Sequence, residues 1–70
     1  MTNKQKKYLA DEIKKSRNEA RLTQSEVAEA SGISVNHYAK IERGEIVPGL
    51  ETFLAIVKAL DAESSDFLPY

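Results

Sequence analysis

Two helix-start signals lie only eleven residues apart in this chain, with a glycine between them, and they restrict its fold more than any other feature. Residues 23–26 (Thr-Gln-Ser-Glu) have the pattern of a capping box, in which the first hydroxyl accepts from the third helical backbone N–H and the glutamate reaches back. Gly32 favours a left-handed helix end, and Ser34 favours a second N-cap. We therefore expect one short helix over about 24–30 and another from Ser34 to residue 42 or 43.

Two short helices joined by a glycine-containing turn are the sequence form of a helix-turn-helix, which we expect over residues 23–43. Apolar spacing and glycine or proline breaks place the other helices around this unit. We expect a first helix over about 5–19, a fourth over about 50–60 and a one-turn fifth over 64–68. Residues 1–5 are polar and basic and are expected to form a loose arm. The sequence thus predicts one all-α, five-helix domain over residues 1–70.

The apolar residues of the expected fourth helix follow the i, i+3, i+4, i+7 spacing of a core-facing stripe. They are Leu50, Phe53, Leu54, Val57 and Leu60. In the first helix, Leu9, Ile13 and Ala20 are expected to face the same core.

A chain of 70 residues with no cysteine and one histidine excludes several classes of site. It cannot form a disulfide or a thiolate zinc site, and it offers no cluster of metal ligands. No phosphate loop or nucleophile–base pair is present, so we expect neither an enzyme nor a cofactor or small-molecule substrate. No apolar run approaches the roughly 18 residues that span a bilayer, and no signal-peptide pattern opens the chain. We expect a soluble, cytoplasmic protein associated with the nucleoid.

The net charge of −1 hides an uneven distribution. Residues 1–43 carry nine lysines and arginines against six acids, a net charge of +3, whereas residues 44–70 carry one lysine against five acids, a net charge of −4. A chain polarised in this way can present a basic face to phosphates while its acidic end faces away. An ordinary solvated helix surface gives the same count, so charge alone leaves both readings open.

Five pieces of the sequence, in this order and spacing, resemble the lambda-repressor and Cro-like helix-turn-helix family, also called the XRE type. They are Leu-Thr-Gln-Ser-Glu-Val-Ala at 22–28, Ser-Gly-Ile-Ser at 31–34, Ile-Glu-Arg-Gly at 41–44, Pro-Gly-Leu-Glu-Thr at 48–52 and Ala-Leu at 59–60. The resemblance covers about residues 9–68. It implies a five-helix DNA-binding domain whose second and third helices form the reading unit. Gly49 departs from the pattern, because relatives usually have Ser or Thr capping the fourth helix.

We expect the first turn of the third helix to enter the major groove and contact base edges. Asn36 can pair with adenine N6 and N7, Ser34 can bond a base edge, and Lys40 can reach a guanine or a phosphate. Val35 stands where many relatives carry a polar residue, and it offers an apolar contact to a thymine methyl. The base-reading candidates are therefore Ser34, Val35, Asn36 and Lys40.

Three further side chains are candidates for phosphate contact: Gln24, His37 and Arg43. Gln24 opens the second helix, whose N-terminus suits an anion, and relatives place a glutamine here against the DNA backbone. Tyr38 lies at an inward position with Ile41 and is expected in the core.

The resemblance also implies an ion pair between Arg17, late in the first helix, and Glu42, at the end of the third. Such a pair would hold the third helix against the scaffold. The apolar C-terminal residues Phe67, Leu68 and Tyr70 are candidates for a dimer interface. We expect a transcriptional regulator that acts as a repressor. It is expected to bind a two-fold, palindromic operator in double-stranded DNA as a homodimer. A protein-interaction module of the same fold, such as an antitoxin or regulatory partner, is the alternative.

Overall fold

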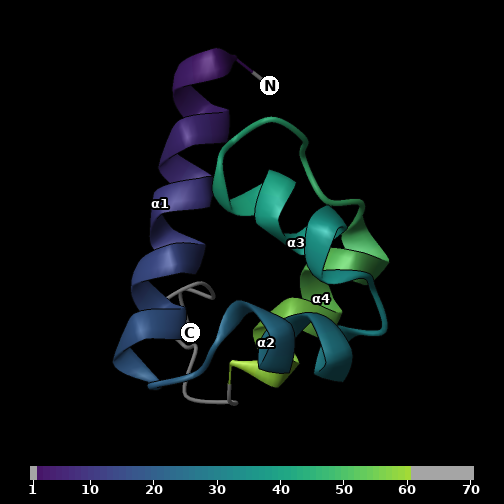
Figure 1. The fold of residues 1–70 in the computed structure, drawn as a ribbon. Coiled ribbons are helices and arrows are strands. Elements are labelled where there is room, and N and C mark those ends of the chain that lie inside the picture. Colours follow the sequence, from purple (N-terminus) through teal and green to yellow (C-terminus); the bar gives the residue numbers. More distant parts are fainter. Residues whose placement is uncertain (1, 61–70) are drawn as a thin grey trace.

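The computed structural model describes residues 2–60, and these contain four helices and no strand (Figure 1). The helices are α1 (Asn3–Glu19), α2 (Gln24–Ser31), α3 (Val35–Glu42) and α4 (Leu50–Ala59). Figure 1 shows α1 along one side of the molecule and the three shorter helices grouped beside it. The all-α class predicted from the sequence is confirmed, and the expected fifth helix over 64–68 lies outside the described residues.

The first helix begins earlier than expected. Thr2 is its N-cap: the Thr2 hydroxyl accepts from the Gln5 backbone N–H at 3.1 Å, and the Gln5 side chain accepts from the Thr2 backbone N–H at 2.9 Å. Residues 3–5 are therefore helical, and the expectation of a loose arm over 1–5 is wrong for them. A reciprocal cap satisfies two backbone donors that would otherwise favour an unwound end.

The first three helices end in the same hydrogen-bonded turn, in which a backbone N–H reaches back five residues to a helix carbonyl. The bonds join Leu22 to Arg17, Ile33 to Ala28 and Glu45 to Lys40, at 3.0–3.2 Å. This turn needs a left-handed residue, and Gly32 and Gly44 supply it with φ angles of +74° and +75°. In the first turn Arg21 takes that place with φ +61°, a conformation that strains a residue with a side chain.

The core lies where all four helices meet. Its buried members are Ile13 from α1, Val27 and Ala28 from α2, Tyr38 and Ile41 from α3, and Ile56 and Leu60 from α4 and its cap. Helix α2 packs against both α3 and α4, and α1 packs against α3. The turn after α3 also closes on α1, because a Cβ atom added at Gly44 would lie 3.7 Å from the Lys7 Cα.

Helix α4 is rotated from the orientation that its apolar spacing predicted. Ile56, Val57 and Leu60 are buried, whereas Leu50 is 73% exposed and Leu54 is 48% exposed. The expected stripe was therefore wrong at these two leucines. Seven of its ten residues are apolar, so the alternative stripe through 53, 56, 57 and 60 satisfies the same spacing.

Helix α1 departs from its expected face at one position. Ile13 is buried and Leu9 packs against the core, but Ala20 is the exposed C-cap. No helix within residues 2–60 is both long and apolar enough to cross a membrane.

Candidate nucleic-acid interface

Helix α3 separates into an inward and an outward face. Tyr38, Ile41 and Glu42 are buried against the other helices, and this confirms Tyr38 as a core residue. The outward face carries the exposed residues Ser34, Val35, Asn36, His37 and Lys40. All four base-reading candidates therefore lie on the solvent side of one helix, together with His37.

The first turn of α3 is built by its cap. The Ser34 hydroxyl accepts from the His37 backbone N–H at 3.0 Å, which fixes where the helix begins. The Ser34 O–H remains a donor, because capping uses only the oxygen lone pair. Val35, 41% exposed, and Asn36 follow directly and project from this turn. Their arrangement presents an apolar group and an amide beside the helix N-terminus.

The structure brings Arg17 of α1 and Glu42 of α3 together. Arg17 Nε donates to Glu42 Oε2 at 2.6 Å, and a second guanidinium nitrogen donates to Glu42 Oε1 at 3.2 Å. The Arg17 and Glu42 side chains are 13% and 2% exposed, respectively. Arg17 also donates to the Leu22 carbonyl at 2.8 Å, so it closes the end of α1 as well. The two-point geometry fixes both the distance and the orientation of α3 relative to α1.

Burial by itself raises the pKa of the Glu42 carboxyl, but the hydrogen bonds from Arg17, the nearby Tyr38 hydroxyl, the hydrogen bond from Gln24 and the charge of Arg17 together outweigh burial and leave the pKa below its usual value. Burial raises the pKa of Tyr38, and the neighbouring Glu42 carboxylate raises it further. Among the described residues the buried Tyr38 hydroxyl has no hydrogen bond of ordinary geometry, although it lies close enough to Glu42 for the charge to act. Glu42 is thus a fixed carboxylate at neutral pH.

Gln24 belongs to the same cluster, and the sequence analysis missed this contact. Its side-chain Nε2 donates to Glu42 Oε1 at 3.1 Å, so three helices meet at one carboxylate. The amide therefore has a scaffold partner as well as a place at the start of α2, the position expected to face a phosphate. Nothing in the local pattern signals this bond, because Glu42 lies eighteen residues away in the chain.

Arg43, the C-cap of α3, is exposed and makes an ion pair with Glu45 through its Nε. The Glu45 hydrogen bond and charge raise the pKa of Arg43. Arg43 stands at the surface, as a phosphate contact requires, but it already has an acidic neighbour. The sequence analysis did not single out Glu45. The expected dimer residues Phe67, Leu68 and Tyr70 lie outside the described residues.

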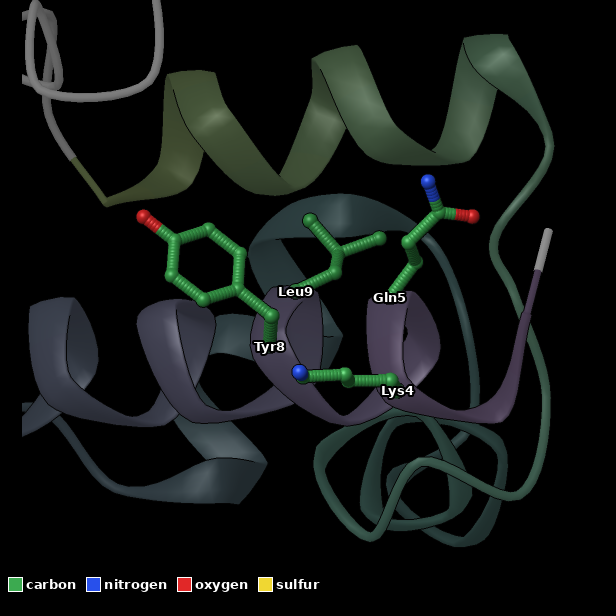
Figure 2. Close-up of a pocket in the computed structure, with 4 residues that line it drawn as sticks. All are labelled: Lys4, Gln5, Tyr8 and Leu9. Carbon is green, nitrogen blue, oxygen red and sulfur yellow. The ribbon is translucent and has the colours of Figure 1, made fainter.

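A separate pocket is lined by four residues of the first half of α1, namely Lys4, Gln5, Tyr8 and Leu9. Figure 2 shows Gln5 and Leu9 directed toward α4, whereas Lys4 lies along α1. These residues do not belong to α2 or α3, so the pocket is distinct from the outward face of α3. Within residues 2–60 no group of three or more His, Cys, Asp or Glu side chains could hold a metal ion.

Comparison with known proteins agrees with this geometry. The profile of a helix-turn-helix family, HTH_3, matches residues 3–68. The chain belongs to the XRE-type helix-turn-helix family. The resemblance drawn from five short pieces of sequence is thereby confirmed over nearly the whole chain. No solved structure gives a significant match.

A curated relative carries the name "Uncharacterized HTH-type transcriptional regulator y4dL" and comes from Sinorhizobium fredii. The chain is 30% identical to it over 56 residues, which is 80% of this chain. The match covers 29% of the length of that relative. The similarity is thus to a helix-turn-helix region within a longer protein.

Proposed function

We propose that this chain is a sequence-specific, double-stranded DNA-binding module of a transcriptional regulator, and not an enzyme. The observation that carries the proposal is the outward face of α3. A capped helix N-terminus there presents Ser34, Val35 and Asn36 to solvent, while Tyr38, Ile41 and Glu42 lock the opposite face. Family membership and the name of the relative support the same function.

The chemistry of that face suits the major groove. An asparagine amide can bond adenine N6 and N7 together, and a valine can contact a thymine methyl group. Lys40, one turn further along the helix, can reach guanine or phosphate. His37 and Arg43 extend the polar surface toward the phosphate backbone, and the N-terminus of α2 offers backbone donors beside Gln24.

We propose that two copies bind a palindromic operator, act as a repressor, and work in the cytoplasm with the nucleoid. A single α3 of eight residues contacts only a few base pairs, which is too little for typical specific affinity. Two copies on half-sites about 34 Å apart would double the contacts. Phe67, Leu68 and Tyr70 are the proposed dimer surface, on the basis of their apolar character.

The test is selection of bound DNA from a random duplex library, followed by titration of half-site and full-site duplexes. We expect a two-fold consensus and cooperative binding to the full site. A consensus without symmetry would contradict the dimer. Failure to retain any duplex at low salt above a control without protein would refute the DNA-binding function and favour a protein-interaction module of the same fold, whereas equal retention of all sequences would refute sequence specificity alone.

A further inference from the structure

The C-terminal end of α3 fixes an acidic residue among basic ones. Gly44 takes the left-handed conformation, so the chain folds back and the Glu45 backbone N–H donates to the Lys40 carbonyl at 3.0 Å. The Gly44 N–H donates to the Ile41 carbonyl at 3.1 Å in the same turn. The turn is therefore held against the end of the helix by two backbone hydrogen bonds, one donated by Gly44 and one by Glu45. Its position does not depend on the side chain.

The side chains at the two ends of this turn are charged, which is unusual for a turn of this type. In such turns the residue after the glycine and the helix residue five positions before it commonly form an apolar contact. Here these positions hold Glu45 and Lys40. The Glu45 carboxylate accepts from Arg43 Nε. This hydrogen bond, with the charges of Arg43 and Lys40, lowers the pKa of Glu45, so the group is ionised at neutral pH.

We infer that Glu45 limits the affinity of this chain for DNA of any sequence by competing with phosphate for Arg43. The inference rests on the proposed DNA-binding function. The Glu45 carboxylate occupies Arg43 Nε and offsets the guanidinium charge, so a phosphate that approaches the remaining nitrogens is attracted less by Arg43 and is repelled by the carboxylate. The Arg43 side chain is 56% exposed and the Glu45 side chain is 50% exposed. Water and salt therefore screen the ion pair, and a phosphate can replace the carboxylate at little cost.

The competition acts on affinity and not on base preference. Asn36 and Ser34 lie at the first turn of α3, whereas Arg43 and Glu45 lie beyond its last turn. Eight helical residues separate the two ends by about 12 Å. Phosphate contacts position a protein on DNA without reading its sequence. Removing the Glu45 charge should therefore strengthen cognate and random DNA binding by the same factor.

The experiment compares Glu45→Gln with Glu19→Gln, a matched control that removes the same charge from an exposed residue at the far end of α1. Binding of each variant and of the unmodified chain to a random-sequence duplex is measured at several salt concentrations. We expect Glu45→Gln to bind about 1.5-fold to fivefold tighter at low salt, which is the range of an exposed charge pair. Its salt dependence should steepen by up to about one unit, because one more phosphate is neutralised.

A second comparison isolates Arg43. In an Arg43→Ala background, Glu45→Gln should gain clearly less affinity for DNA than it gains in the unmodified chain, because no Arg43 guanidinium is left for Glu45 and phosphate to compete for. A gain of equal size in both backgrounds would overturn the inference, as would a gain matched by Glu19→Gln. Weaker binding of Glu45→Gln to DNA would mean that Glu45 orients Arg43 on the duplex. A changed consensus among the selected DNA sequences would mean that Glu45 contacts a base. Either result overturns the inference.

The outcomes also separate this inference from the proposed function. If the unmodified chain binds duplexes but Glu45→Gln leaves affinity and salt slope unchanged, the competition is refuted and DNA binding stands. If no variant binds any duplex with a salt dependence, the proposed function is refuted and the inference falls with it.

Discussion

Replacement of Arg17 by alanine should destabilise the fold severely, because it leaves the Glu42 carboxylate without its charge partner. Arg17 makes two hydrogen bonds to that carboxylate and one to the Leu22 carbonyl, and the Glu42 side chain is only 2% exposed. Breaking a buried pair from one side costs about 3–5 kcal/mol. Gln24 still donates to Glu42 in the variant, so we expect a loss near the lower end, about 3 kcal/mol.

A domain of this size has roughly 0.05–0.15 kcal/mol of stability per residue, so that loss is a large fraction of the total. Urea titration followed by far-UV circular dichroism measures it, and each kcal/mol should lower Tm by about 4–8 °C. The matched variant Arg17→Met with Glu42→Leu replaces the pair by apolar side chains and should recover much of the loss. A Tm that hardly moves in Arg17→Ala would refute the reasoning and show that water solvates the carboxylate without cost. A double variant as unstable as the single one would show that packing, and not the lone charge, is responsible.

Three further results are expected. The pKa of Glu42 is lowered in the folded state, so the ionised carboxylate stabilises the fold above the unfolded carboxyl pKa, and this stabilisation is lost as pH falls through the folded pKa. Urea titration should therefore show a constant difference in stability between the unmodified chain and Glu42→Gln at neutral pH. That difference should narrow over the acidic range. Arg21→Gly should raise the free energy of unfolding by about 0.5–1 kcal/mol, because relief of the left-handed strain exceeds the entropy that glycine adds to the unfolded chain. A loss of stability would show that the Arg21 side chain makes a contact that outweighs the strain. Asn36→Ala should weaken cognate binding by about 1–3 kcal/mol and relax preference at one base pair, whereas equal losses on cognate and random duplexes would place Asn36 on a phosphate.

The elements that sequence analysis located well are those set by local chemistry. The Thr23 capping box, the left-handed Gly32 and the Ser34 cap depend on residues within five positions of each other, and all three form as predicted. The same rule would have found the start of α1. Thr2 and Gln5 have the spacing of a capping box, but the polar and basic residues around them favour a loose arm.

The elements that sequence analysis located poorly depend on partners distant in the chain. The exposure of Leu50 and Leu54 follows from how α4 lies on α2. The helix did carry a signal of this orientation, because Glu51 and Lys58 lie on one side of it, opposite the buried residues at 56, 57 and 60, and the apolar spacing outweighed that signal. The bond from Gln24 to Glu42 likewise joins two helices. Arg17 and Glu42 were paired only because the family resemblance supplied the partner, since spacing along one chain does not reveal a contact across twenty-five residues.

Adjacent residues of helix α3 point in different directions, some into the core and some into solvent. One short helix can therefore pack against the scaffold and still expose side chains to a partner. Successive residues of an α-helix point about 100° apart, so Glu42 turns inward to Arg17 and Gln24 while its neighbour Arg43 turns outward. At the other end, Tyr38 is buried one residue after the exposed His37. Because the buried residues Tyr38, Ile41 and Glu42 hold α3 in place, substitutions at the exposed residues Val35, Asn36 or Lys40 leave this anchoring intact. Substitutions on the outward face should therefore affect the proposed DNA contact with little effect on stability, whereas a change at Glu42 should lower stability.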